Sequence, residues 1–359
     1  MRNGKINVAI IGECYIGTGK GLCPIELFKS IRKIDSKYNF KLYLRDTAPF
    51  HGSDVVKIKT FKTKIRLLNG LGYYIPLFFK LFKDKSIDII HAYDEKTNIV
   101  ANILGKPHVV TGYDLDPIHF KFPFNYIFRK IYRHLNKAKS ILVVSDYAGE
   151  MISKEFPDLS KKIITIHLGT DINRFKPTTK KRRIYLNIGI LGNLDKKLWN
   201  VFDKILKEYG GKVKIVLGGY LPKEFNYLKS HQGVIYKGRI EESDLVKHYQ
   251  DIDIFVYKIN ADGATFELIP LEAMASGCAV VVSNVGALPK EVIKNGGLLV
   301  ENSEKSFYEG IKKMIDNKKL RQEYQKKGRK QAKELTWDKH AEKHLEIYDK
   351  IKLSTNPNF

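Results

Sequence analysis

Short apolar runs alternate with longer amphipathic stretches along the whole chain. The apolar runs are residues 6–12, 40–44, 87–93, 107–112, 141–145 and 163–169 in the first half, and 184–192, 213–219, 233–238, 253–258, 278–283 and 297–300 in the second. Short, nearly continuous apolar runs are typical of parallel strands that are buried on both faces. The stretches between them predict covering helices. The pattern therefore predicts an α/β protein with two doubly wound, Rossmann-like domains.

A polar, basic stretch separates the two series of strands. Its sequence, RFKPTTKKRR (174–183), contains a proline and is typical of a linker. We expect a first domain over residues 1–175, a linker over 176–183 and a second domain over 184–336. A final helix is predicted from residue 337 onward, because apolar and aromatic residues recur there at helical spacing.

Composition narrows the class of protein. The chain has 359 residues, which is enough for two domains, and three scattered cysteines, which argue against a disulfide framework. It contains no signal-like segment and no apolar run near 18 residues. We expect a cytoplasmic protein that can associate with the inner membrane surface. The net charge of +24 favours anionic partners, although a lysine-rich proteome would give the same excess.

Three loops that follow predicted strands carry candidate binding residues. In GECYIGTGKG the Walker and dinucleotide patterns both fail, which leaves a glycine-rich turn whose backbone at Gly17 and Gly19 can approach a phosphate or a sugar. A purely structural tight turn is the alternative explanation. VVTGYDLDP places Tyr113, Asp114 and Asp116 at a strand end. The two carboxylates are too few for a metal site without further ligands. ILGNLDKK offers Asn193 and Lys197 to a diphosphate, or only a solvated lysine pair.

The stretch FELIPLEAMASGCAVVVS joins a loop, a helix and a buried strand. Pro270 suits a first helical turn and Gly277 a helix end. The backbone amides of Glu267, Leu268 and Ile269 lie where an anion is attracted. The Glu272 carboxylate can accept hydrogen bonds from a ribose diol, but it can equally be a first-turn glutamate that the helix dipole favours.

Several motifs in order resemble the retaining GT-B glycosyltransferases of family four. The segments are IITIHLGTDINRFKP, VIYKGRIEESDLVKHYQDIDIFVYK and LEAMASGCAVVVSNVGALPKEVI, and the likeness runs over almost the whole chain. The resemblance implies two facing Rossmann-like domains, with the final helix returning to the first. It implies that the helix before CAVVVS holds the donor's diphosphate and sugar, and that Glu272 holds the ribose. It also implies that Gly238 and Arg239 flank the base and that the Gly17–Gly19 turn closes over the donor.

The chain departs from the family pattern at several positions. The family's first glutamate, eight residues before Glu272, is replaced by Ala264, so Asp262 or Glu267 is expected to take over its contact with the sugar. Asn193 stands where the family has arginine. Lys197 matches the family's lysine only with a one-residue shift, and Tyr113 stands where the family has histidine.

The resemblance implies transfer of a sugar from a nucleotide sugar to an acceptor hydroxyl, with retention and without a metal or cofactor. Tyr113 and Asp114 are the candidate catalytic residues. A nucleotide-sugar epimerase of the same fold is an alternative. A nucleic-acid binder or DNA-modifying sugar transferase is another, which the charge favours and the absence of a recognition motif disfavours.

Two stretches of the first domain combine charge with aromatic residues. Residues 57–85 hold eight Lys or Arg and one acid, and residues 118–140 hold six and none. Apolar stripes that pack on the sheet explain the pattern, because Rossmann helices need them. The alternative is that aromatics such as Tyr73, Phe79 and Phe82 lie at an anionic membrane beside the lysines, which would suit a lipid-linked acceptor.

Overall fold

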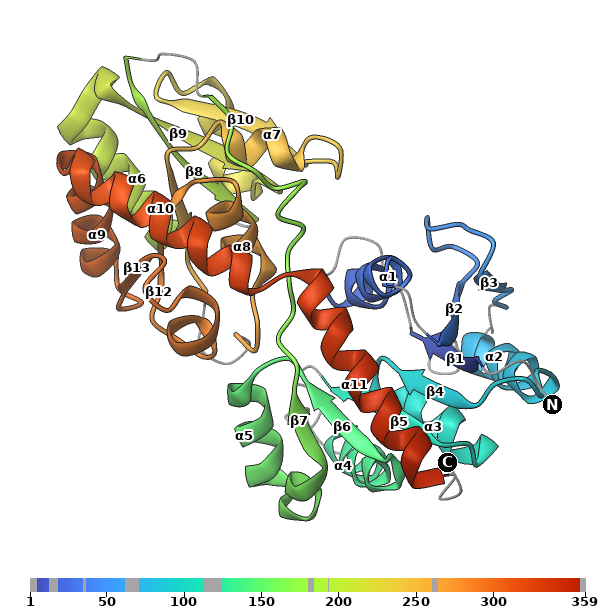
Figure 1. The fold of residues 1–359 in the computed structure, drawn as a ribbon. Helices are drawn as coiled ribbons and strands as arrows, with labels where there is room; N and C mark the ends of the chain where they lie inside the picture. The colour runs from blue at the N-terminus through green and yellow to red at the C-terminus, as the bar shows by residue number, and fades with distance from the viewer. Residues whose placement is uncertain are drawn as a thin grey trace. The chain divides into compact units, whose positions relative to one another are not determined.

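The structure is a computed structural model that describes residues 5–12, 19–34, 37–61, 71–112, 124–179, 184–192, 194–259 and 264–355. The chain divides into two compact units (Figure 1). The first comprises Met1–Leu168 with Trp337–Phe359, and the second comprises Gly169–Thr336. The expectation of an α/β protein with two Rossmann-like domains is confirmed.

The first unit is built on a parallel sheet with strand order β3-β2-β1-β4-β5-β6-β7 among the described residues. Its strands are β1 (Ile6–Ile11), β2 (Tyr38–Arg45), β3 (Val55–Ile58), β4 (Ile89–Ala92), β5 (His108–Gly112), β6 (Ser140–Val143) and β7 (Ile163–Thr165). Its α-helices are α1 (Gly19–Ile31), α2 (Leu71–Lys83), α3 (Glu95–Leu104), α4 (Phe124–Arg133), α5 (Asp146–Glu155) and α11 (Trp337–Thr355). In β1, Ile10 pairs with Leu42 on one side and with His91 on the other.

One face of this sheet is covered by helices α2 to α5. Their buried side chains, such as Tyr73, Leu77, Ala101 and Ile152, form one core with the strands. Tyr73 is fully buried, and its hydroxyl donates to the carbonyl of Gly12 over 3.0 Å. The alternative that places Tyr73 at a membrane surface is therefore wrong, because the ring packs in the core with side chains of β1 and β2.

The final helix packs on the first unit through three buried histidines. α11 lies against α1, and its His340 and His344 rings contact each other in a tilted arrangement, with centroids 4.3 Å apart. The His344 ring also stacks on His91 of β4, whose Nδ1 lies 2.7 Å from the hydroxyl of Tyr348. Burial lowers the pKa of all three histidines, and that of His344 to about 4. We call His91, His340 and His344 the buried histidine cluster.

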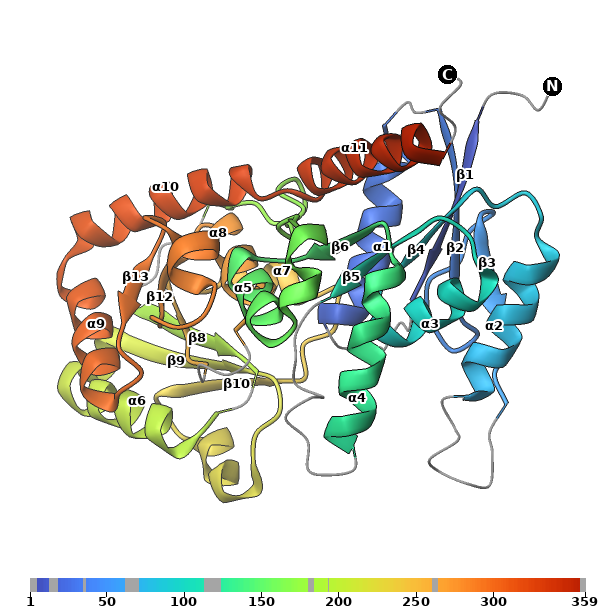
Figure 2. The ribbon, with the colours of Figure 1, turned by 90° about the horizontal axis from the view of Figure 1, so that it is seen from below.

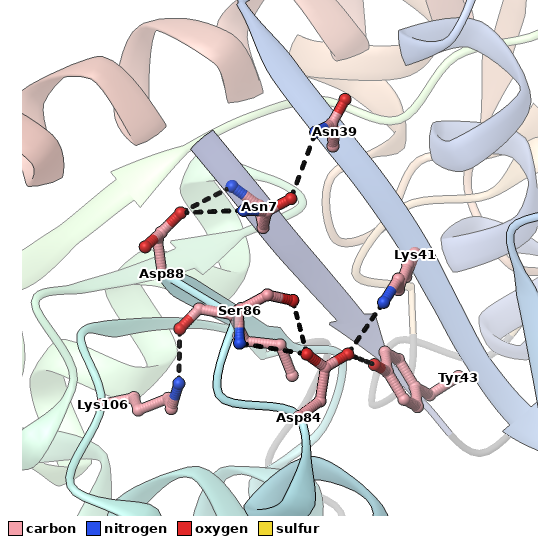
Figure 3. A network of polar contacts seen from close by, with 9 residues as sticks. Asn7, Asn39, Lys41, Tyr43, Asp84, Ser86, Asp88 and Lys106 are labelled. Carbon is pink, nitrogen blue, oxygen red and sulfur yellow. Dashed lines mark hydrogen bonds and ion pairs between the residues drawn. The ribbon is translucent and has the colours of Figure 1, made fainter. Parts of the chain in front are cut away.

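A polar network fixes the loop that follows α2 (Figure 3). The Asp84 carboxylate accepts hydrogen bonds from Lys41 (2.8 Å), the Tyr43 hydroxyl (3.2 Å) and the Ser86 hydroxyl (2.5 Å). Burial would raise the pKa of Asp84, but the bonds from Lys41 and Ser86 outweigh it and lower this pKa to about 2. Asp84 is the single acid of residues 57–85, and its carboxylate is bound by a lysine of β2.

The second unit has a parallel sheet with strand order β10-β9-β8-β11-β12-β13 among the described residues. Its strands are β8 (Leu186–Leu191), β9 (Val213–Gly218), β10 (Val234–Gly238), β11 (Ile254–Tyr257), β12 (Ala279–Ser283) and β13 (Leu298–Val300). Its α-helices are α6 (Lys196–Tyr209), α7 (Leu245–Gln250), α8 (Leu268–Ala275), α9 (Glu304–Asp316) and α10 (Lys318–Glu334). Helix α6 packs against α9 and helix α8 against α10 (Figure 2).

The expected strands are all present, and the structure adds β3. The first unit ends at Leu168, earlier than position 175, where the sequence placed the boundary. The reason is that the next residues bind to the second unit. The Thr170 N–H donates to the Leu335 carbonyl, and the Arg329 guanidinium donates to the carbonyls of Ile172 and Phe175. In the parts of the chain that the structure describes, no helix combines the length and the apolar character needed to cross a bilayer.

Candidate nucleotide-sugar site

Glycine turns bring the carboxyl ends of β8, β9 and β10 close together. The Gly192 N–H donates to the Gly218 carbonyl over 2.9 Å, and the Gly219 N–H donates to the Gly238 carbonyl over 2.7 Å. Gly219 has φ +114, and a Cβ there would lie 2.6 Å from the Gly192 carbonyl oxygen. A side chain at position 219 would therefore separate β8 from β9. Backbone hydrogen bonds between glycines thus hold the ends of these three strands together.

Helix α8 follows β11 in the chain and starts without a side-chain cap. Its N-cap residue, Glu267, makes no capping hydrogen bond, and its carboxylate accepts from the Tyr257 hydroxyl over 2.5 Å instead. Pro270 has no N–H, and the N–H groups of Leu268 and Ile269 have no acceptor within the helix. This helix end therefore offers backbone donors and the positive end of the helix dipole to an anion.

Glu272 lies one turn further along α8 and is held from α7. Its Oε2 accepts from the Tyr249 hydroxyl over 2.9 Å, and the Tyr249 ring is fully buried. Burial, and then the nearby Glu272 charge, raise the pKa of Tyr249 well above its ordinary value, so the hydroxyl remains a donor. This bond fixes the position of the carboxylate. A glutamate that served only to stabilise the helix dipole would not require such a bond.

Lys258 and Asp195 form a contact that the sequence did not predict. Lys258 follows β11, its side chain is only 10% exposed, and its Nζ lies 2.5 Å from Asp195 Oδ2. Asp195 caps α6 by accepting from the Leu198 N–H over 2.7 Å. Burial would raise the pKa of Asp195, but the bonds from Lys258 and Leu198 outweigh it and lower this pKa. The sequence did contain one signal for this contact, which is a lysine at the end of an otherwise apolar predicted strand.

The loop after β10 is charged but largely paired. Lys237 Nζ lies 2.7 Å from Asp251 Oδ2, and the Arg239 side chain, 76% exposed, lies 3.3 Å from Glu241. Beneath this loop His248 is buried, with its Nε2 3.1 Å from the Ile190 carbonyl oxygen. Burial, and then Lys237, lower the pKa of His248 to about 4, so this imidazole is neutral at pH 7.

Ala264 is fully buried against the backbone of the loop after β12. Its carbonyl accepts from the Ala287 N–H over 2.9 Å, and Gly286 approaches so closely that a Cβ there would lie 2.3 Å from the Ala264 oxygen. The Ala264 side chain is thus enclosed next to Gly286, whereas the glutamate expected from the resemblance would bring a carboxylate into this buried position.

The described residues bring together Glu267, Leu268, Ile269 and Glu272 on α8. Gly238 and Arg239 lie at the end of β10, and Lys197 is an exposed residue in the first turn of α6. Gly19 is the first residue of α1 in the other unit. Gly17, Tyr113, Asp114, Asn193 and Asp262 lie outside the described residues.

Comparison with known families identifies the chain. Residues 171–331 match the model described as "Glycosyl transferases group 1", and residues 38–174 match "Glycosyltransferase Family 4". The chain belongs to the group 1 glycosyltransferases. The two models together span most of both units, in agreement with the GT-B fold expected from the sequence.

Curated relatives are distant and are matched over part of their length. Spore coat protein SA of Bacillus subtilis is 24% identical over 251 residues, which cover 60% of this chain and 66% of that protein. O-antigen chain mannosyltransferase B of Escherichia coli is 24% identical, with 67% of this chain and 68% of that protein covered. The chain thus matches about two thirds of the length of these relatives.

Solved structures of the same fold cover nearly the whole chain. Sucrose-phosphate synthase from Thermosynechococcus elongatus superposes with a TM-score of 0.79 at 16% identity and covers 98% of this chain and 100% of that one. Anabaena Alr3699/HepE, solved in complex with UDP-glucose, superposes with a TM-score of 0.73 at 16% identity over 96% of this chain and 100% of that one. At such identities the likeness shows the fold alone.

Proposed function

We propose that the protein transfers a sugar from a nucleoside-diphosphate sugar to an acceptor hydroxyl, with retention of configuration. The observation that carries the proposal is the pairing of the uncapped start of α8 with the fixed carboxylate of Glu272. A diphosphate needs donors and positive charge, and a ribose diol needs an acceptor. Both lie within one turn of the same helix.

The donor's diphosphate is assigned to the Leu268 and Ile269 amides, supported by Lys197 and Lys258. Lys258 is the better placed of the two cations to act as a fixed charge, because it is largely buried and held by Asp195, whereas Lys197 is exposed. Each charge-assisted contact contributes about 1.5–3 kcal/mol. The base is assigned to the loop at Gly238 and Arg239.

The sugar hydroxyls are assigned to Glu267 in place of a carboxylate at position 264. Ala264 is enclosed, whereas Glu267 lies at the start of α8 and is oriented by Tyr257. Amide variants test the choice. Glu267→Gln should lose sugar transfer while keeping nucleoside diphosphate binding, and full activity of this variant would reject the assignment. Full activity in both Glu267→Gln and Asp262→Asn would reject the idea that either residue replaces the missing carboxylate.

The proposed reaction needs positioning and charge stabilisation more than a protein nucleophile. The acceptor hydroxyl attacks the anomeric carbon on the face that the diphosphate leaves, and a leaving phosphate oxygen takes its proton. The α8 amides and Lys258 stabilise the diphosphate as its charge develops, so the proposed step uses neither a metal ion nor a cofactor. Tyr113 and Asp114 are proposed to act at the acceptor.

The acceptor is proposed to be lipid-linked or held at the inner membrane surface, with the protein bound peripherally from the cytoplasm. Among relatives, one is named an O-antigen chain mannosyltransferase and another a capsular polysaccharide biosynthesis glycosyltransferase. The basic excess of the chain suits such an anionic surface. The epimerase and nucleic-acid alternatives are not favoured, since both matching models are glycosyltransferase models.

A panel of nucleotide sugars tests the proposal. The true donor should raise the melting temperature, since a ligand at 100 times its dissociation constant adds about 2.7 kcal/mol to the free energy of unfolding. The anomeric configuration of the product, read by NMR, then tests retention. If no nucleotide sugar or nucleoside diphosphate stabilises the protein, the assignment of α8 as a donor site is wrong.

A further inference from the structure

Helices α2, α3 and α4 expose apolar side chains on the side that faces away from their sheet. On α2 these are Leu71, Ile75, Phe79 and Phe82, which recur at helical spacing. Ile103 of α3 is 68% exposed, and Tyr126 and Ile127 of α4 are also exposed. Helix α3 contacts both α2 and α4, so the three helices lie side by side and form one layer (Figure 2). We call it the α2–α4 face.

A groove runs between α3 and α4 on this face. It encloses about 390 Å³, within the range of small-molecule sites. Most of its lining is apolar, from Ile99, Ile103, Ile127 and Ile131. The polar lining residues are Asn102, Lys130, His134 and Lys137, of which both lysines are exposed. An apolar groove beside exposed cations suits an anionic amphiphile, because the groove can hold the acyl chain while the cations bind the phosphate.

Arg129 of α4 is paired with Glu155, but the lysines of the α2–α4 face have no ion-pair partner among the described residues. Lys85 lies over the Phe82 ring, 4.2 Å from its centroid, and Lys130 lies over the Tyr126 ring at 4.7 Å. Lys80 and Lys83 are exposed beside Phe79 and Phe82. Asp84 is turned toward Lys41 and Tyr43, as Figure 3 shows. Aromatic rings beside lysines are typical of helices that lie in a membrane interface.

We propose that the α2–α4 face docks on an anionic bilayer and that the α3–α4 groove takes an acyl chain of one phospholipid, whose phosphate binds Lys130 and Lys137. This inference rests on the proposed function, because docking on the bilayer would hold the enzyme where its acceptor lies. A second copy of this chain is a poor occupant, because each copy carries +24 and would place cations against cations.

The first experiment measures sedimentation of the full chain with vesicles. Wild type should bind phosphatidylglycerol–phosphatidylcholine vesicles, lose binding at high salt and ignore pure phosphatidylcholine. Lys130→Glu with Lys137→Glu should weaken binding by about tenfold or more, because two attractive charges become repulsive. The matched control is Lys318→Glu with Lys319→Glu on α10, both exposed in the other unit.

The second experiment tests the groove itself. Ile103→Trp should show fluorescence quenched by lipids brominated in the acyl chain. Ile184→Trp is the control, since Ile184 is 95% exposed in the second unit. Ile103→Asp should weaken vesicle binding, while Ile184→Asp should not.

The outcomes separate this inference from the proposed function. Unquenched Ile103→Trp, or equal binding by Ile103→Asp and its control, overturns the groove assignment. If Ile103→Asp instead dissociates a dimer in ultracentrifugation and leaves vesicle binding unchanged, the face joins two copies and the proposal is wrong. Nucleoside diphosphate binding should be unchanged in every variant. Its absence from wild type would count against the donor site and not against the groove.

Discussion

Replacing Glu272 by glutamine should weaken nucleotide binding without destabilising the protein. The amide keeps an oxygen that can accept from the Tyr249 hydroxyl, so the contact between α8 and α7 survives. What is lost is the negative charge offered to the ribose. A hydrogen bond to a charged group contributes about 1.5–3 kcal/mol and a neutral one about 0.5–1.5, so two weakened bonds cost about 2 kcal/mol. That corresponds to about 30-fold in the dissociation constant.

Alanine at position 272 should add a second effect. It leaves the buried Tyr249 hydroxyl without its acceptor, which costs about 1–3 kcal/mol of stability. Glu272→Ala should therefore lower both nucleotide affinity and the melting temperature, whereas Glu272→Gln lowers only affinity. Glu309→Gln is the control, because Glu309 is an exposed residue of α9.

Calorimetric titration with ribonucleotides and 2′-deoxyribonucleotides is the decisive assay. The nucleotide to use is whichever of UDP, GDP or ADP stabilises wild type most. Wild type should prefer the ribonucleotide, and Glu272→Gln should lose that preference. If Glu272→Gln keeps the wild-type ratio of the two affinities, its carboxylate does not bind the ribose and serves only to join α8 to α7.

Three further predictions follow from single contacts. The contribution of the buried histidine cluster to the free energy of unfolding should be constant above pH 6.5. Below pH 6.5 it should fall by about 1.4 kcal/mol per pH unit for each histidine, because the unfolded chain takes up protons that the folded chain excludes. Chemical unfolding from pH 7.5 to 4.5 should therefore show a shallower slope in His344→Phe than in wild type. Gly286→Ala should cost at least about 1–2 kcal/mol in the same assay, since φ is +57, while Gly211→Ala, with open space around it, should cost less. Lys258→Met should weaken the binding of nucleoside diphosphate more than that of nucleoside monophosphate, and more than Lys197→Met does. If Lys258→Met binds nucleoside diphosphate as tightly as wild type, Lys258 is not part of the donor site.

The strands of the fold could be predicted because parallel sheets demand continuous apolar runs. The run at residues 278–283 is an example, and β12 there is buried throughout. Strand β3 was missed because VVKI is only four residues long and lies at the sheet edge, where burial is partial and the apolar signal weak. The burial of Tyr73 could not be predicted from composition either. A tyrosine in a lysine-rich stretch can be buried or exposed, depending on which way its helix is rotated.

The part of the candidate site whose residues lie close together in the chain could be predicted from the sequence. The start of α8 and Glu272 are close in sequence, so the pattern of the helix placed them together. The contacts of Tyr249 with Glu272 and of Lys258 with Asp195 join residues far apart in the chain. Such pairs depend on how loops of neighbouring strands meet, which spacing alone does not reveal.

The central claim is tested most directly by following nucleoside diphosphate release from a panel of nucleotide sugars, with lipid-linked acceptors present and absent. The account predicts that one donor is consumed, that its sugar appears on the acceptor, and that Glu272→Gln at the same concentration slows this strongly. Conversion of the sugar to its epimer without an acceptor, or no consumption of any donor, would contradict it.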